Sequence, residues 1–112
     1  MNCRSNAKAE TRQGNTRNIA VDFEDGTVIS NDWRCFIQVR HKSTGNLTSI
    51  DREVINKNSD MTSFITMLTA TETASLSEGD YVIGVQVENS VTGEVIEDIM
   101  ELKITKQWVI KS

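Results

Sequence analysis

Proline is absent from this chain of 112 residues. No turn can therefore depend on a backbone angle fixed by a ring, and glycine and asparagine must supply the turn positions. Cysteine is almost as rare, with only Cys3 and Cys35, so the sequence indicates no disulfide framework. Because Cys35 alternates with Ile37 and Val39, we expect it to be buried as a small apolar side chain.

Long apolar runs are missing as well. No stretch of about 18 apolar residues occurs, so the sequence predicts no transmembrane helix. Residues 1–17 lack the apolar centre of a signal peptide, and we expect a chain made in the cytoplasm. The length fits one domain with a single modest core, and it is too short for a two-domain enzyme.

Residue patterns that carry chemistry are scarce. His41 is the only histidine, and without a second histidine or a nearby cysteine it predicts neither a zinc site nor a catalytic triad. No Gly-x-Ser-x-Gly elbow and no glycine-rich phosphate loop occurs. We therefore predict a protein that is not an enzyme, with no catalytic residue, no cofactor and no metal ion.

Charge is distributed unevenly. Residues 1–17 contain one acidic residue, Glu10, whereas residues 18–112 contain fifteen acidic and eight basic residues. The basic residues of the first segment are Arg4, Lys8, Arg12 and Arg17. This segment has no large apolar residue after Met1 with which to offset the entropy of ordering. We interpret residues 1–17 as an extended basic arm that docks onto a neighbouring subunit, the alternative being that it packs on its own domain.

The acidic side chains of residues 18–112 gather in two groups. The groups are Asp22, Glu24 and Asp25, and then Glu94, Glu97, Asp98 and Glu101. We interpret both as solvated negative charge, with a calcium site as the open alternative because calcium takes oxygen ligands from turns. An acidic body repels nucleic acid, so neither a nucleic-acid partner nor a membrane partner is expected.

Alternating apolar and polar residues predict strands throughout the rest of the chain. The expected strands are Asn18–Phe23, Thr27–Ser30, Trp33–Lys42, Leu47–Val54, Phe64–Thr69, Tyr81–Glu88 and Val95–Trp108. Thr69 and Glu72 have the spacing of a helix-starting capping box, which predicts a short helix ending near Leu76. About seven strands with one helical turn favour an antiparallel β-sandwich, with Leu47–Val54 at an edge.

Three positions in these strands point to contacts outside the core. Phe36 faces outward from its strand, and Trp108 lies near the chain end, so both are candidate interface residues. Gly84 interrupts an alternating strand, where a glycine often marks the close approach of another backbone or side chain.

Five segments, taken together, resemble the sequence pattern of a known family. These are Cys35–Arg40, Glu72–Leu76, Glu78–Tyr81, Val85–Val87 and Met100–Ile104. The stretch from Leu68 to Lys103 resembles small immunoglobulin-like domains of tailed-bacteriophage virion proteins, such as the amino-terminal part of baseplate upper proteins. The usual proline near Ser77 and Glu78 is missing, and the basic segment before Asn18 has no counterpart in that pattern.

The resemblance implies an immunoglobulin-like β-sandwich with a role in the virion. We expect a structural component of a tail, a neck or a capsid accessory layer, with other phage structural proteins as partners and several copies in a symmetric assembly. Docking would use the N-terminal arm and the sheet surface. The alternative is a carbohydrate- or receptor-binding module, against which the sparse aromatic residues count.

Overall fold

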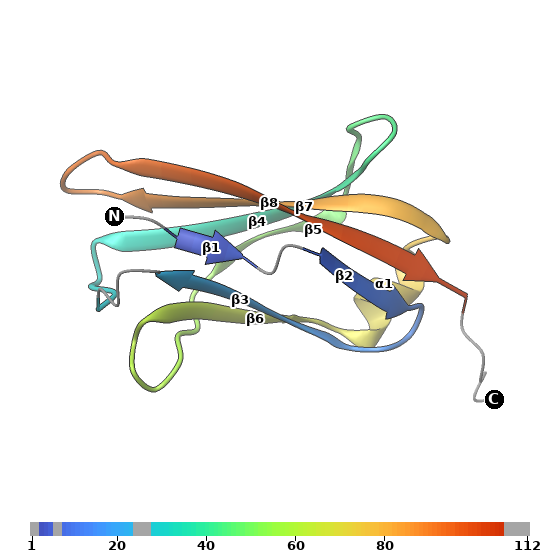
Figure 1. Ribbon diagram of the computed structural model, residues 1–112, viewed down its shortest axis with the longest axis horizontal. Helices are drawn as coiled ribbons and strands as arrows, with labels where there is room; N and C mark the ends of the chain where they lie inside the picture. The colour runs from blue at the N-terminus through green and yellow to red at the C-terminus, as the bar shows by residue number, and fades with distance from the viewer. Residues whose placement is uncertain (1–2, 6–7, 24–27, 107–112) are drawn as a thin grey trace.

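Two β-sheets packed face to face form the protein (Figure 1). The computed structural model describes residues 3–5, 8–23 and 28–106, with side chains from Glu10 onward. The elements are β1 Cys3–Ser5, β2 Lys8–Arg12, β3 Arg17–Phe23, β4 Trp33–His41, β5 Leu47–Val54, β6 Ser63–Leu68, α1 Ala70–Ser75, β7 Gly79–Asn89 and β8 Val95–Thr105. The predicted all-β sandwich with one short helix is confirmed.

The sheets differ in size. One has three strands in the order β1-β3-β6, and the other has five in the order β2-β8-β7-β4-β5. All pairs between these strands are antiparallel except β2 with β8, which is parallel. As predicted, β5 lies at an edge.

Strict alternation places one face of each central strand in the core. On β4, the side chains of Trp33, Cys35, Ile37 and Val39 are all buried. On β6, Phe64 and Leu68 are buried while Ile65 and Met67 face solvent, which settles the register of a segment that is apolar on both sides. The inward positions of β7 and β8 complete the core between the sheets, and they are Tyr81, Ile83, Val85, Val87, Met100, Leu102 and Ile104.

The N-terminal segment is part of both sheets, so the prediction of an extended arm is wrong for the described strands. Strand β1 pairs with β3, with Cys3 opposite Phe23. Strand β2 runs parallel to β8, with Lys8 opposite Glu101. A polar segment needs no apolar surface of its own when its main chain completes the hydrogen bonds of an existing sheet edge.

The turn after β2 is tied to α1 at one end of the sandwich (Figure 1). The Gln13 amide Nε2 donates to the Leu76 carbonyl over 2.7 Å. The Gly14 N–H donates to Thr73 Oγ1 over 3.0 Å, and the same hydroxyl donates to the Asn15 carbonyl over 2.7 Å. Thr73 is fully buried at this junction. The N-terminal segment is therefore held by side chains as well as by strand pairing.

Two features of the sandwich resemble features of immunoglobulin folds. Tyr81 near the start of β7 donates its buried hydroxyl to the carbonyl of Ser77, four residues upstream, over 2.8 Å. This is the tyrosine corner of immunoglobulin folds. Trp33 of β4 packs its ring edge-on against Phe23, with ring centroids 5.3 Å apart. Cys35 is buried, as expected.

Most strand boundaries lie within one or two residues of the expected ones, and the larger differences are at residues 27–30 and at the end of β8. Residues 28–30 form no strand, although Ile29 is fully buried and its N–H donates to the Met61 carbonyl. The turn at residues 24–27 lies outside the described residues. Strand β8 ends at Thr105, and Trp108 also lies outside them. With β1 and β2, the described residues form eight strands rather than about seven.

The predicted capping box starts α1. The Glu72 N–H donates to Thr69 Oγ1 over 3.1 Å, and the Thr69 N–H donates to Glu72 Oε1 over 3.0 Å. Arg52 of β5 forms an ion pair with Glu72 and donates to the Met67 carbonyl over 2.8 Å, which links β5 to β6 and α1. Partial burial raises the pKa of the Glu72 carboxyl, but the Thr69 N–H and the Arg52 guanidinium outweigh it and hold that pKa below its usual value.

This geometry predicts a pH-dependent contribution of Glu72 to stability. Because the folded pKa is lowered, the contribution is present above the unfolded pKa of about 4.3 and is lost as pH falls through the folded value. We expect Glu72→Gln to lower the free energy of unfolding by about 0.5–1 kcal/mol at pH 7 and to have no effect near pH 2. Urea unfolding at both pH values measures this, with Glu78→Gln as the exposed control. An equal loss at both pH values would contradict the prediction.

Candidate functional site

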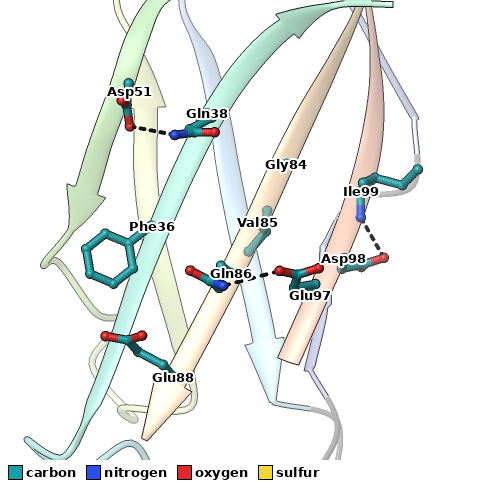
Figure 2. Close-up of a pocket in the computed structure, with 10 residues that line it drawn as sticks. All are labelled: Phe36, Gln38, Asp51, Gly84, Val85, Gln86, Glu88, Glu97, Asp98 and Ile99. Carbon is teal, nitrogen blue, oxygen red and sulfur yellow. Dashed lines mark hydrogen bonds between the residues drawn. The ribbon is translucent and has the colours of Figure 1, made fainter. Parts of the chain in front are cut away.

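A shallow hollow of about 480 Å³ lies on the outer face of the five-stranded sheet (Figure 2). It spans four strands, β5, β4, β7 and β8. Its lining includes Phe36, Gln38, Asp51, Gly84, Glu97 and Ile99. We call it the Gly84 hollow, after the residue at its centre in Figure 2.

The strand register explains why the sheet is hollow here. Gly84 of β7 lies between Gln38 of β4 and Ile99 of β8. At this outward-facing position the glycine contributes no side chain, so the surface dips between its neighbours. A Cβ placed on Gly84 would meet only the Gln38 carbonyl oxygen, at 3.8 Å. The expected close approach of another segment is therefore not found within the described part of the chain, and the hollow is open.

This open space makes a prediction for Gly84→Ala. A glycine inside a strand costs about 0.5–1 kcal/mol relative to alanine, and here the added methyl group has room. We expect the free energy of unfolding to rise by about 0.5–1 kcal/mol in chemical denaturation. Gly93→Ala is the control, because Gly93 has a φ of 77° and its alanine variant should lose stability. A less stable Gly84→Ala variant would contradict this account of the hollow.

The lining of the Gly84 hollow is acidic. Its acidic residues are Asp51, Glu88, Glu97 and Asp98, and the described lining includes no lysine, arginine or histidine. Asp51 accepts a hydrogen bond from the Gln38 amide over 3.3 Å, and Glu97 accepts one from the Gln86 amide over 3.2 Å. Both carboxylates are thus held by neutral donors on the neighbouring strands (Figure 2).

Phe36, a predicted interface residue, forms one wall of the Gly84 hollow. The guanidinium of Arg34 lies 5.0 Å from its ring centroid and covers part of the ring. Arg34 also binds both carboxylate oxygens of Glu53 at 3.0 Å. The hydrogen bond and the charge of Glu53 raise the pKa of Arg34, and the hydrogen bond from Arg34 lowers the pKa of Glu53. Phe36 is therefore half-buried within its own sheet.

The predicted arm residues do not converge on this hollow. Arg12 is exposed on β2 opposite Thr105, whereas Arg17 is half-buried on β3 opposite Leu68, in the other sheet. Arg4 and Lys8 lie in β1 and β2, and their side chains are outside the description. Trp108 lies outside the described residues altogether. Sheet membership depends on pairing between distant strands, so this separation could not be predicted from local sequence patterns.

A second hollow, of about 550 Å³, lies on the outer face of the three-stranded sheet. Ile65 and Met67 line it and are 39% and 44% exposed, with Ala20 opposite Ile65 on β3. The sequence of β6 is apolar at both inward and outward positions, and this pattern was the indication that an apolar surface would lie on the outer face.

Other candidate chemistry is limited. The ring of His41 lies at the end of β4, 4.8 Å from the ring of Tyr81. The described residues contain no group of three histidine, cysteine or acidic side chains placed to hold a metal ion. Within the same residues, no helix has the length and apolar character needed to cross a membrane.

No protein-family model matches this chain, and no curated protein matches it either. The fold and its surfaces are therefore the basis for a functional proposal. Of the two hollows, the Gly84 hollow combines charged, amide and apolar side chains, a mixture that is typical of recognition surfaces.

Proposed function

We propose that this protein is a non-enzymatic structural component of a bacteriophage virion that docks onto neighbouring subunits through the outer face of its five-stranded sheet. The observation that carries the proposal is the open Gly84 hollow, which no described part of the chain fills. Ile99 beside it is 67% exposed, and Val95 on the same face of β8 is 53% exposed. Exposed apolar side chains around a concave surface favour contact with another protein.

The sheet face replaces the N-terminal arm in this proposal. Residues 8–12 are paired along β8, so they cannot reach a neighbouring subunit as a free arm without leaving the sheet. The centre of this face is rigid by comparison, since β4 and β7 have a paired strand on both sides, while the part of β8 before Glu101 pairs with β7 alone among the described strands. A rigid surface loses little conformational entropy when it binds.

The assignment to a virion is supported by the resemblance to phage immunoglobulin-like domains. The segments that carry it correspond to α1, the tyrosine corner and strands β7 and β8. Tail, neck and capsid accessory layers are all repeated structures, so we expect other phage structural proteins as partners and several copies per particle.

The test is incorporation into particles. The chain is expressed in cells that produce the phage encoding it, with the phage copy of the gene deleted, and purified particles are analysed by quantitative mass spectrometry. The wild-type chain should be present in stoichiometric amounts, and Gly84→Leu, which fills the hollow, should be reduced at least about tenfold. Ala74→Leu on the exposed face of α1 is the matched control and should be incorporated normally.

Absence of the wild-type chain from particles would overturn the proposal. In that case the alternative is a carbohydrate- or receptor-binding module, which the aromatic, amide and acidic groups of Phe36, Gln38 and Asp51 around the Gly84 hollow favour. Saturable glycan binding by the wild-type chain that is lost in Gly84→Leu would support it.

A further inference from the structure

We infer that the Gly84 hollow receives an arginine or lysine side chain from a partner protein. This inference rests on the proposed docking function and specifies the chemistry of the partner. Charge complementarity is its basis, because Asp51, Glu88 and Glu97 project on the outer face around the hollow and no basic residue is among the described lining residues.

Two carboxylates place negative charge at opposite ends of the hollow, about three strand spacings apart, so that a cationic group in it can contact either one. Asp51 lies on β5 and Glu97 on β8, on opposite sides of Gly84 (Figure 2). Each accepts one hydrogen bond from a glutamine amide. A carboxylate can accept about four, so each retains acceptor capacity for a guanidinium or ammonium group.

The basic side chains beside the hollow are already engaged by groups of this chain, some of which belong to its lining. Arg34 binds Glu53, and Lys42 binds Glu101 over 2.9 Å. Arg40 donates to the Gly45 carbonyl over 3.0 Å and to Gln38 Oε1 over 2.9 Å. The second of these bonds fixes the orientation of the Gln38 amide, which leaves its Nε2 to donate to Asp51. These contacts hold the neighbouring cations at the rim, and no lysine or arginine is among the described lining residues.

Apolar walls suit the rest of such a side chain. Phe36 and Ile99 flank Gly84 on either side (Figure 2). Arginine and lysine have long aliphatic stems that pack along apolar surface while the charged group contacts acidic oxygens. The missing side chain of Gly84 lets the partner's main chain approach the sheet, and a volume of about 480 Å³ holds a side chain together with its backbone.

The test is a titration of the full ¹⁵N-labelled chain, followed by amide chemical shifts. The probes are acetyl-Leu-Arg-Leu-amide, its lysine analogue, and the peptides with glutamine or glutamate at the centre. The arginine and lysine peptides should shift the amides of Gly84, Gln86 and Ile99 saturably at low ionic strength. The glutamine peptide should bind at least about fivefold more weakly, and salt at about 0.15 M should weaken the cationic peptides.

Three variants test whether the peptides bind at the Gly84 hollow. The double variant Asp51→Asn with Glu97→Gln should lose roughly fivefold or more in affinity for the arginine peptide. The control double variant Asp60→Asn with Glu78→Gln removes the same charge from exposed sites away from the hollow and should bind like the wild type. Gly84→Leu should abolish the shifts at Gln86 and Ile99. Native amide spectra of all three variants show that the fold is retained.

Several outcomes would overturn the inference. Equal binding of the arginine, glutamine and glutamate peptides would do so, as would shifts outside the hollow or a saturable response to calcium chloride at the same amides. In particles, normal incorporation of the Asp51→Asn/Glu97→Gln variant together with loss of Gly84→Leu would refute the cationic partner but leave sheet docking intact. Absence of the wild type from particles would refute the proposed function while the peptide titration still reported on the hollow.

Discussion

A chain that lacks residues 1–15 is expected to lose cooperative folding or to melt at least about 15 °C below the full chain. The deletion removes β1 and β2 and leaves the edge of β8 unpaired. It also removes buried Thr11 and the hydrogen bonds from Gln13 and Gly14 to the α1 region. At about 1 kcal/mol for each lost backbone hydrogen bond, the loss approaches the 5–15 kcal/mol that stabilises a typical domain.

Thermal unfolding followed by circular dichroism measures the effect of this deletion. The control replaces Arg4, Lys8 and Arg12 with glutamine in the full chain, which removes the positive charge but keeps the main chain that pairs with β3 and β8. We expect this variant to melt within a few degrees of the wild type. Unchanged melting of the truncated chain would show that the N-terminal strands are dispensable, as an independent arm would be.

Tyr81→Ala is expected to lower the free energy of unfolding by about 3–5 kcal/mol. The side chain is 1% exposed and is one of the largest in the core. Its ring contacts His41, and its hydroxyl bonds the Ser77 carbonyl. Removal leaves a cavity between β7 and the connection from α1, and it frees the turn that leads into β7.

Tyr81→Phe distinguishes the contribution of the hydroxyl to stability from that of the ring. It keeps the packed volume and removes the hydrogen bond to Ser77, so we expect a loss of about 1–2 kcal/mol. Urea denaturation with a common m-value gives both free energies. A loss in Tyr81→Phe as large as that in Tyr81→Ala would mean that the hydroxyl dominates. An unchanged free energy of unfolding in Tyr81→Phe would mean that the tyrosine corner does not depend on the hydroxyl.

Features coded by neighbouring residues could be predicted from the sequence. The alternation in Trp33–His41 and in Gly79–Asn89 marks one buried face because the side-chain period of a strand is two. The capping box of Thr69 and Glu72 depends only on spacing within one helical turn. The central strands and α1 were therefore predicted correctly from short windows.

Features that depend on distant pairing could not be predicted. Strands β1 and β2 are held by their main chains, which every sequence possesses, and their side chains show no apolar pattern. Ile29 is fully buried in a segment that was predicted as a strand but is irregular over residues 28–30, because no neighbouring strand pairs with it. The Gly84 hollow requires the register of four strands, and only this register places Asp51 and Glu97 around one glycine.

The parallel pairing of β2 with β8 has a mechanical consequence. The chain enters β2 at one end of this strand pair and leaves β8 at the other end. Tension between these two points therefore acts along the strands, and it loads the hydrogen bonds between Lys8–Arg12 and β8 in shear, so that they must break together rather than one by one. A domain paired in this way resists stretching along its own chain.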